Sequence, residues 1–370
     1  MGLRSSTLED MDLNRALGSF DKCPVLITGH TGFKGGWLSA LLTRAGALVS
    51  GYALPPTTSP SLYEATRPFQ LAHERLTDIR DRTQLRTFLA TAQPRVIFHL
   101  AAQPLVRDSY TQPIETFDTN VMGTLSLLDA ACQTPSVEAI VVVTSDKCYE
   151  PSDRHTGHIE SDPLGGHDPY SASKACQDIA TQSWRRSYPS GPLIATARAG
   201  NVIGGGDWAH DRLIPDMYRA LESGKPLQVR NPSAVRPWQH VLDALSGYIS
   251  LGAHLLSGER AFADAWNFGP AESELETVSW ICDELSAQWG TTWHSPTTAS
   301  NEPHENPSLR LDSSKATQLM NWQPRWSTQE ALKQTGRWYA QFRAGTPATT
   351  LIQEQIEQYL DATEPSPFPA

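Results

Sequence analysis

A strand pattern that runs directly into a glycine loop and then into a helix pattern most restricts how this chain can fold. Residues 24–29, PVLITG, are typical of a buried strand, and residues 36–46, GWLSALLTRAG, carry apolar side chains at helical spacing before a glycine stop. The strand signal returns in LVSGYAL, RVIFHLAA and EAIVVVTS, with amphipathic segments between them. This alternation predicts βαβ units and a parallel sheet that is covered on both faces.

The amino-acid composition of the chain changes after about Gly200. Glycine, proline and tryptophan become frequent there, and the strand signals become few and short. We therefore predict an α/β fold: a Rossmann-type, doubly wound parallel sheet with a smaller C-terminal lobe that binds substrate at the carboxyl ends of the strands. The expected divisions are an N-terminal extension (1–20), a dinucleotide-binding Rossmann domain (21–200), a substrate lobe with some segments returning to the large domain (201–345), and a C-terminal tail (346–370).

The glycine loop GHTGFKGGW lies between the first strand and the first helix. It places Gly29, Gly32 and Gly35 at GxxGxxG spacing. The first glycine permits a tight turn, and the later ones let the backbone approach a pyrophosphate on the helix N-terminus, where free N–H groups favour negative charge. An ordinary glycine-rich turn is the alternative. The position at the first strand–helix junction favours a dinucleotide site.

The choice between NAD and NADP stays open at this point. Many NAD-binding folds carry an acid about 20 residues after the glycine loop, but VSGYALPP has neither an acid nor an arginine at the strand end. Asp78, in LTDIRD, follows the next strand and could reach the adenine side. Equally, Asp78 could be the N-cap of the helix that follows.

Composition excludes several classes of function. The net charge of −10, without a run of lysine or arginine, disfavours nucleic acid as a partner. The five cysteines are scattered without CxxC spacing, so we expect no metal site, no disulfide framework and a cytoplasmic location. We expect no membrane association, because no apolar stretch approaches the roughly 20 residues that a membrane helix needs.

Two groups of reactive side chains stand out. The strand run AIVVV (139–143) ends in Thr144 and then in a hydroxyl, an acid and a base, Ser145, Asp146 and Lys147. Such a turn is either a charged, solvated strand end or part of an active site. Further on, PYSASK places Tyr170 and Lys174 on one face at the start of a predicted helix. A lysine ammonium beside a phenol favours the phenolate, which can act as a base on a sugar hydroxyl.

These motifs together resemble the extended short-chain dehydrogenase/reductase family, over about residues 23–340. Within it, the chain is most similar to nucleotide-sugar 4,6-dehydratases, and in particular to the branch that acts on CDP-glucose. The resemblance is carried by TGHTGFKG, HLAAQPLVRDSY, TNVMGT, TSDKCY, DPLGGHDPYSASK, ARAGNVIGGGDW, DRLIPD and RPWQHV.

The resemblance implies an NAD cofactor and a role for each motif. Tyr170 would take the proton of the sugar 4-hydroxyl, Ser145 would hydrogen-bond that oxygen, and Lys174 would hold the nicotinamide ribose. The cofactor-binding residues implied are Gly29, Thr31, Gly32, Phe33, Lys34, Gly35, Asp78, Ile79, Leu100, Ala101, Ala102, Asn120, Tyr170 and Lys174. The substrate-binding residues implied are Gln103, Asn201, Arg212 and Arg236.

Asp146 and Lys147 fit the elimination of water that such enzymes perform. Oxidation at C4 acidifies the C5–H, so elimination needs an acid for the C6 hydroxyl and a base for C5–H. Asp146 is the expected acid and Lys147 the expected base. In related dTDP-glucose enzymes the second position is a glutamate, so Lys147 departs from that pattern. Since a lysine accepts a proton only when neutral, Lys147 could instead stay charged and stabilise the enolate.

The side chains expected on the substrate side allow other interpretations. Arg212 and Arg236 can bind phosphate oxygens bidentately, although a lone arginine often only faces solvent. His240 and Asp243 are expected to organise their loop. Trp208 and Trp238 could pack on the ligand, but large aromatics most often belong to a core.

We therefore expect an enzyme that dehydrates CDP-glucose to CDP-4-keto-6-deoxyglucose with bound NAD. The family also implies a homodimer, with residues 119–132 and 170–187 as candidate contacts. A 4-epimerase or an NADP-dependent reductase of the same family is one alternative, and a non-catalytic dinucleotide sensor is another. An epimerase needs no acid–base pair at Asp146 and Lys147, so that pair favours dehydration.

Overall fold

A parallel sheet forms the centre of the protein. The computed structural model describes residues 12–67, 70–152, 156–295 and 309–362. Its seven-stranded sheet has the order β11-β6-β5-β4-β1-β2-β3, and every neighbouring pair is parallel. The strands are β1 (Pro24–Thr28), β2 (Leu48–Ala53), β3 (His73–Leu76), β4 (Val96–His99), β5 (Ala139–Val143), β6 (Leu193–Ala199) and β11 (Ala265–Phe268). The predicted α/β fold with a doubly wound sheet is confirmed.

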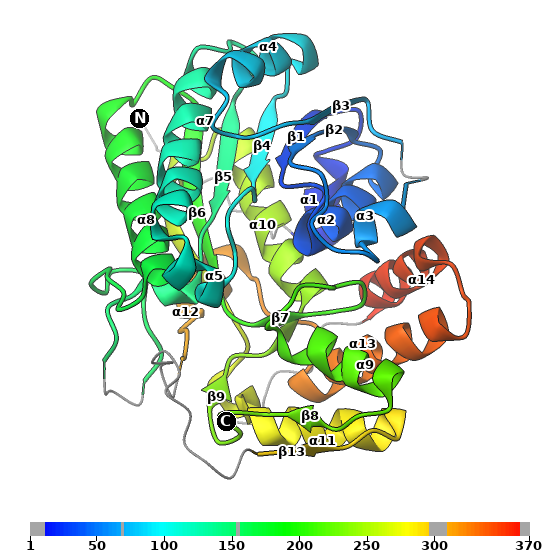
Figure 1. Cartoon of the computed structure of the whole chain (residues 1–370). Helices are drawn as coiled ribbons and strands as arrows, with labels where there is room; N and C mark the ends of the chain where they lie inside the picture. Colours follow the sequence, from blue (N-terminus) through cyan, green and yellow to red (C-terminus); the bar gives the residue numbers. More distant parts are fainter. Residues whose placement is uncertain (1–11, 68–69, 153–155, 296–308, 363–370) are drawn as a thin grey trace.

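Helices cover both faces of this sheet, as Figure 1 shows. The helices α1 (Leu13–Gly18), α2 (Phe33–Arg44) and α10 (Val241–Leu256) share one apolar core. The helices α4 (Arg82–Ala92), α7 (Gly123–Cys132) and α8 (Pro169–Ser187) contribute to a second core. Within β1, Val25 and Ile27 belong to the first core and Leu26 to the second. This alternation explains why the buried strands read as continuous apolar runs.

The loops after β1 and β4 meet at the carboxyl edge of the sheet, where the strand order reverses. Gly29 ends β1 with a φ of 76°, a left-handed conformation that glycine adopts without strain. A Cβ atom on Gly29 would lie 2.7 Å from the backbone nitrogen of Ala101, which follows β4. The two loops can therefore approach this closely only with glycine at position 29, and their junction is where open α/β sheets bind ligands.

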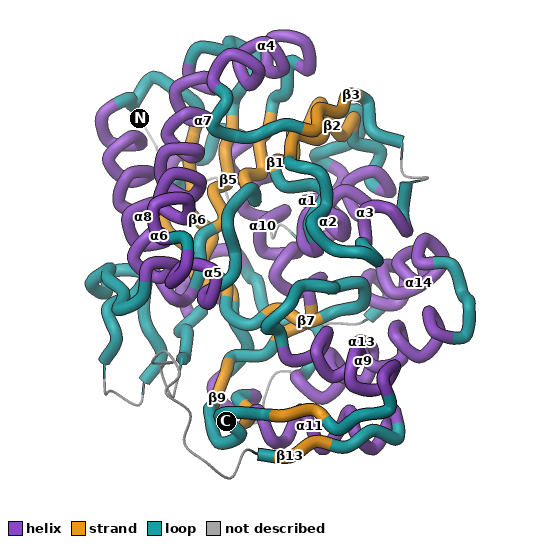
Figure 2. Tube along the Cα trace, viewed as in Figure 1, coloured by secondary structure: helices purple, strands orange, loops and turns teal. Residues whose placement is uncertain are grey.

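A smaller lobe lies beyond this edge, below the sheet in Figure 1. Its strands are short and do not belong to the central sheet, as the tube in Figure 2 shows. They form the pairs β7 (Val202–Ile203) with β10 (Gln239–His240), β9 (Val235–Arg236) with β12 (Glu276–Thr277), and β8 (Leu227–Gln228) with β13 (Trp293–His294). The lobe's helices are α9 (Leu213–Ser223), α11 (Val278–Trp289) and α13 (Thr328–Arg343).

The remaining described elements are short connections. They are α3 (Leu62–Ala65), α5 (Val106–Thr111), α6 (Pro113–Phe117), α12 (Ser314–Met320), the π-helical turn η1 (Asp118–Met122), and the 3₁₀ turns η2 (Asp146–Cys148), η3 (Arg260–Phe262) and η4 (Glu272–Glu274). None of the helices in the described ranges is long and apolar enough to cross a membrane.

Each of the two expected terminal segments contains a helix. Within the expected tail, residues 348–361 form helix α14 (Ala348–Asp361), which packs on α2 and α13. Leu351, Ile352, Ile356 and Tyr359 repeat at helical spacing and are buried, and this apolar face holds the helix against the core. Within the expected extension, α1 packs on α10. Residues 1–11 and 363–370 lie outside the described ranges.

Candidate active site

The turn after β5 presents a carboxylate to the edge of the sheet. Ser145 caps the turn η2, because its hydroxyl accepts a hydrogen bond from the backbone N–H of Lys147 at 3.2 Å. The same hydroxyl donates to Oδ1 of Asp146 at 2.9 Å. The other oxygen of Asp146, Oδ2, is buried and has no hydrogen-bond partner among the described residues. A buried carboxylate oxygen without a partner is costly, so it points to a ligand group that this oxygen contacts.

Helix α8 places Tyr170 and Lys174 beside that turn. The helix begins at Pro169, and the side chain of Asp168 caps it by accepting a hydrogen bond from Ser171 N–H at 2.9 Å. The ammonium of Lys174 donates to Oε1 of Gln177 at 2.9 Å. It also donates to the carbonyl of Val143, the last residue of β5, at 3.4 Å. The hydrogen bond to Val143 thereby links the start of α8 to the end of β5.

Burial shifts the titration of these groups. Burial raises the pKa of Tyr170 to about 12, and a hydrogen bond with the Ser145 hydroxyl opposes this shift. Burial, together with the nearby charge of Lys34, lowers the pKa of Lys174 to about 7. Without ligands, Tyr170 is therefore a neutral phenol, and it needs nearby positive charge before it can serve as a base.

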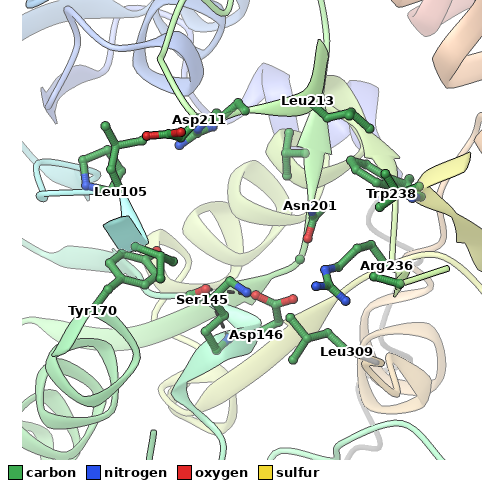
Figure 3. Close-up of a pocket in the computed structure, with 18 of the residues that line it drawn as sticks. Leu105, Ser145, Asp146, Tyr170, Asn201, Asp211, Leu213, Arg236, Trp238 and Leu309 are labelled. Atoms are coloured by element: carbon green, nitrogen blue, oxygen red, sulfur yellow. Dashed lines mark hydrogen bonds between the residues drawn. The ribbon is translucent and has the colours of Figure 1, made fainter. Parts of the chain in front are cut away.

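A single cavity of about 610 Å³ joins these groups to the small lobe, a volume typical of a small-molecule site. Figure 3 shows Tyr170 towards one end of it, Arg236 and Trp238 towards the other, and Ser145 and Asp146 between them. The cavity lining also includes Lys34, Lys147, Asn201 and Arg212. The structure thus brings together the predicted acid–base residues and three of the four residues expected to bind substrate, Asn201, Arg212 and Arg236.

The two arginines differ in their surroundings. Arg236 is buried and donates to the carbonyl of Val235 at 2.9 Å. Arg212 is half-buried and pairs with Asp207 at 3.2 Å. Trp238 lines the cavity, and its indole N–H donates to the carbonyl of Glu276. Trp208 instead packs within an aromatic cluster of the lobe, as expected for a core residue.

The glycine loop leads directly into the first turn of α2. Gly32 is the N-cap of α2, and no side chain caps the N–H groups of the first turn. Phe33 and Lys34 begin the helix, and the Thr31 hydroxyl donates to Leu54 on the neighbouring segment at 2.9 Å. The backbone N–H groups of Leu100 and Ala101 are satisfied by the hydroxyl of Thr28. This edge can hold a pyrophosphate against the helix N-terminus.

Asp78 does not cap the next helix, and that interpretation was wrong. Asp81 is the N-cap of α4 and accepts from Gln84 N–H. Asp78 pairs with Arg80 at 2.6 Å, and this guanidinium holds the pKa of Asp78 below its usual range. The next residue, Ile79, is buried and packs on Gly123.

Gln103 and Asn120 are engaged inside the protein. Asn120, in the turn η1, accepts from Gln103 N–H at 2.8 Å and donates to the Ser173 hydroxyl at 2.9 Å. The side chain of Gln103 donates to the carbonyl of Leu105 and to the Thr116 hydroxyl, both at 3.0 Å. Gln103 is not part of the cavity lining. Its side-chain amide instead stabilises the loop after β4 through these two hydrogen bonds. The structure therefore does not place it with the other expected substrate-binding residues.

Several residues of the site carried no signal in the sequence. Arg107 and Asp211 form an ion pair of 3.3 Å, and both line the cavity. The hydroxyl of Tyr248, from α10, accepts a hydrogen bond from Lys34 at 3.5 Å. These partners are more than 100 positions apart along the chain, so no local spacing can reveal them. His240 caps α10 and Asp243 accepts from Tyr359, which agrees with an organising role.

Comparison with known proteins identifies the family. Residues 26–335 match the model of the family described as GDP-mannose 4,6 dehydratase. The chain is 45% identical, over 92% of its length and 96% of the relative's, to the CDP-glucose 4,6-dehydratase of Salmonella typhimurium. The chain belongs to the 4,6-dehydratase family. The resemblance of its motifs to nucleotide-sugar dehydratases is therefore confirmed.

Solved structures of related proteins share the fold of this dehydratase family member. The dTDP-glucose 4,6-dehydratase of Streptomyces venezuelae, solved with NAD bound, superposes with a TM-score of 0.74 at 24% identity, over 88% of this chain and 99% of that chain. The UDP-glucose 4-epimerase of Thermotoga maritima, solved with UDP-glucose, gives a TM-score of 0.74 at 20% identity, over 86% and 99%. Within the described ranges, no group of three or more histidine, cysteine, aspartate or glutamate residues is placed to hold a metal ion.

Proposed function

We propose that this protein is an NAD-dependent dehydratase that converts CDP-glucose into CDP-4-keto-6-deoxyglucose and water. The similarity to the Salmonella CDP-glucose 4,6-dehydratase along almost the whole chain carries the proposal. The gathering of Ser145, Asp146, Lys147 and Tyr170 around one cavity supports it. The identity of the base, cytosine, rests on that similarity alone.

The residues at the glycine loop fit NAD. Gly29 leaves room for the close approach of the β1 and β4 loops, and the uncapped first turn of α2 offers N–H groups to a pyrophosphate. When bound, NAD supplies a hydride acceptor for the first step and a hydride donor for the last. Lys174, buried beside the end of β5, would hold the nicotinamide ribose.

In the oxidation step, Tyr170 takes the proton of the sugar 4-hydroxyl while a hydride leaves C4. The buried phenol has a raised pKa, so this role requires the positive charge of Lys174 to stabilise the phenolate. The hydroxyl of Ser145, which forms a hydrogen bond with Tyr170, orients the same sugar oxygen. The product of this step is a 4-keto sugar.

In the elimination step, the ketone acidifies the neighbouring C5–H. Lys147 in its neutral form accepts that proton, and Asp146 in its protonated form donates to the C6 hydroxyl, which leaves as water. The free oxygen of Asp146 is available for this contact. A hydride then returns to C6 and a proton to C5, so the sugar loses one water overall and no net electrons.

The anchors for the nucleotide diphosphate lie on the small lobe. Arg236 and Arg212 line the cavity from different segments and can bind phosphate oxygens. Asn201, just after β6, can hydrogen-bond the diphosphate or the sugar. Binding through the lobe would leave the hexose beside Asp146 and Tyr170.

Turnover of CDP-glucose in deuterated water tests the proposal. We expect the product to lose one water and to gain one deuterium at C5, without added reductant, as read by mass spectrometry. Loss of water with no deuterium at C5 would reject the elimination mechanism. Inversion at C4 without loss of water would identify a 4-epimerase instead, and consumption of NADPH in proportion to product would identify a reductase.

We also propose that the protein forms a homodimer through residues 119–132 and 170–187. Apolar side chains are exposed on these and adjacent segments: Ile114 is 79% exposed, Ile179 51% and Met122 40%. Exposed apolar side chains grouped in this way are typical of an interface.

A charge in this surface is expected to dissociate the dimer. Ile179→Lys should raise the dimer dissociation constant about 100-fold or more, because the interface would bury an unpaired ammonium. Light scattering across a dilution series measures this. Leu319→Lys, at a 58% exposed site on α12, is the matched control and should leave the dimer intact. An unchanged dimer in the Ile179→Lys variant would place the interface elsewhere.

The proposed location is the cytoplasm. All five cysteines are free, and Cys23, Cys148 and Cys282 are buried, as expected for a reducing compartment. A small nucleotide sugar is the proposed partner, and the net charge of −10 disfavours nucleic acid.

A further inference from the structure

A fully buried ion pair lies behind the candidate active site. Asp178, on α8 one turn after Lys174, and Arg198, on β6, both have side chains with 0% exposure. Two parallel bonds join them: Arg198 Nε donates to Oδ2 and Nη2 donates to Oδ1, each at 2.8 Å. Neither residue belongs to the cavity lining, so neither contacts a ligand there.

This pair holds both ends of the turn that carries Ser145, Asp146 and Lys147. At the start of the turn, the Thr144 hydroxyl donates to Oδ2 of Asp178 at 3.2 Å. At its end, Arg198 Nη1 donates to the hydroxyl of Tyr149 at 2.7 Å. The guanidinium also lies 4.9 Å from the centre of the Tyr149 ring.

The surroundings satisfy the remaining hydrogen-bonding capacity of the pair. Arg198 Nη1 also donates to the Glu160 carbonyl at 3.0 Å, and Gln182 donates to Asp178 Oδ1 at 3.0 Å. The Tyr149 hydroxyl donates a hydrogen bond to Asn267 Oδ1 at 2.7 Å, and burial raises the pKa of this phenol, so it remains a donor. A buried ion pair adds little stability compared with apolar side chains of the same size. A geometric role is therefore the better explanation for the cost of burying it.

We propose that Asp178 and Arg198 are positioning residues that fix the acid–base turn in register with the Tyr170–Lys174 helix. This inference rests on the proposed function. Of the groups proposed for oxidation, Tyr170 and Lys174 belong to α8 itself and only Ser145 lies on the turn that the pair holds. Both groups proposed for elimination, Asp146 and Lys147, lie on that turn. Loss of the pair therefore impairs elimination of water more than oxidation at C4.

Two variants separate this role from simple stabilisation. Tyr149→Phe keeps the ion pair and removes only the hydroxyl that joins Arg198 to the end of the turn. The double variant Asp178→Leu with Arg198→Met removes both charges together, because either single change would leave an unpaired buried charge. Tyr359→Phe is the control for loss of a buried tyrosine hydroxyl: its hydroxyl bonds Asp243 at 2.7 Å and lies outside the cavity lining, whereas Tyr149 is part of that lining.

Single-turnover measurements with CDP-glucose read the two steps separately. Absorbance of the reduced nicotinamide follows oxidation, and deuterium at C5 with loss of water follows elimination. We expect Tyr149→Phe to slow elimination about 10-fold and the double variant about 100-fold, a size known for small misplacements of catalytic groups. Oxidation should change less than about 3-fold, so that the 4-keto sugar and reduced cofactor accumulate. Tyr359→Phe should show neither effect.

Equal slowing of both steps in Tyr149→Phe would overturn the inference, because it would indicate a general structural role. Unchanged kinetics in that variant would overturn it as well. If the double variant does not fold, Tyr149→Phe alone decides. Failure of the wild-type protein to convert CDP-glucose would instead reject the proposed function, so the two failures are distinguishable.

Discussion

Replacing Tyr170 with phenylalanine is expected to slow the oxidation of CDP-glucose at C4 by about 10²- to 10⁴-fold, the range known for loss of a general base. The change removes the oxygen that accepts the proton and leaves the ring in place. The helix should stay in position, because Tyr170 N–H donates to the Ser109 hydroxyl at 3.1 Å and Lys174 keeps its bonds to Gln177 and Val143. Stopped-flow absorbance of the reduced nicotinamide measures the step.

Binding measurements distinguish a lost base from a damaged site. Calorimetric titration should give NAD and CDP-glucose affinities for Tyr170→Phe within about 3-fold of the wild type, since the phenol oxygen is not proposed as their main anchor. Tyr188→Phe is the control, because Tyr188 ends the same helix and is 53% exposed. A Tyr170→Phe variant that reduces its cofactor at the normal rate would exclude Tyr170 as the base.

Local sequence patterns predicted the architecture because the position of a residue in the sheet or in a turn restricts which residue types can occur there. The central strands are buried on both faces, as Val25, Leu26 and Ile27 illustrate, so most of their residues are apolar. Gly29 is recognisable in the sequence because few residues other than glycine fit a turn that has a positive φ and a neighbouring loop in close contact. The YxxxK spacing placed Tyr170 and Lys174 one turn apart on α8, because helical geometry converts that spacing directly into proximity.

Long-range partnerships could not be predicted in this way. Gln103 follows a strand end as a ligand-binding residue would, yet the fold directs its amide to Leu105 and Thr116. Arg198 is charged within an apolar strand, but only the packing of α8 on β6 provides Asp178 as its partner. The segment before Leu351 contains several threonines and a proline and was expected as a tail, although docking on the core makes it the start of α14.

Lys147→Ala is expected to separate the two chemical steps. Oxidation at C4 should proceed within about 3-fold of the wild-type rate, because Ser145, Tyr170 and Lys174 remain. Elimination should fall by about 10²- to 10⁴-fold, since the group proposed to take the C5 proton is lost. Rapid quenching at saturating NAD, followed by mass spectrometry in deuterated water, should show the 4-keto sugar with its C6 hydroxyl retained and no deuterium at C5.

Lys147→Arg then determines which role the lysine plays. Arginine keeps the positive charge but does not lose its proton in a protein, so it can stabilise an enolate and cannot serve as a base. If Lys147 is the base, the arginine variant should be as slow in elimination as the alanine variant. Recovery of elimination in Lys147→Arg would assign the lysine to enolate stabilisation and the proton transfer to another group. Loss of cofactor reduction in Lys147→Ala at saturating NAD would contradict both roles, because it would place Lys147 in the oxidation step.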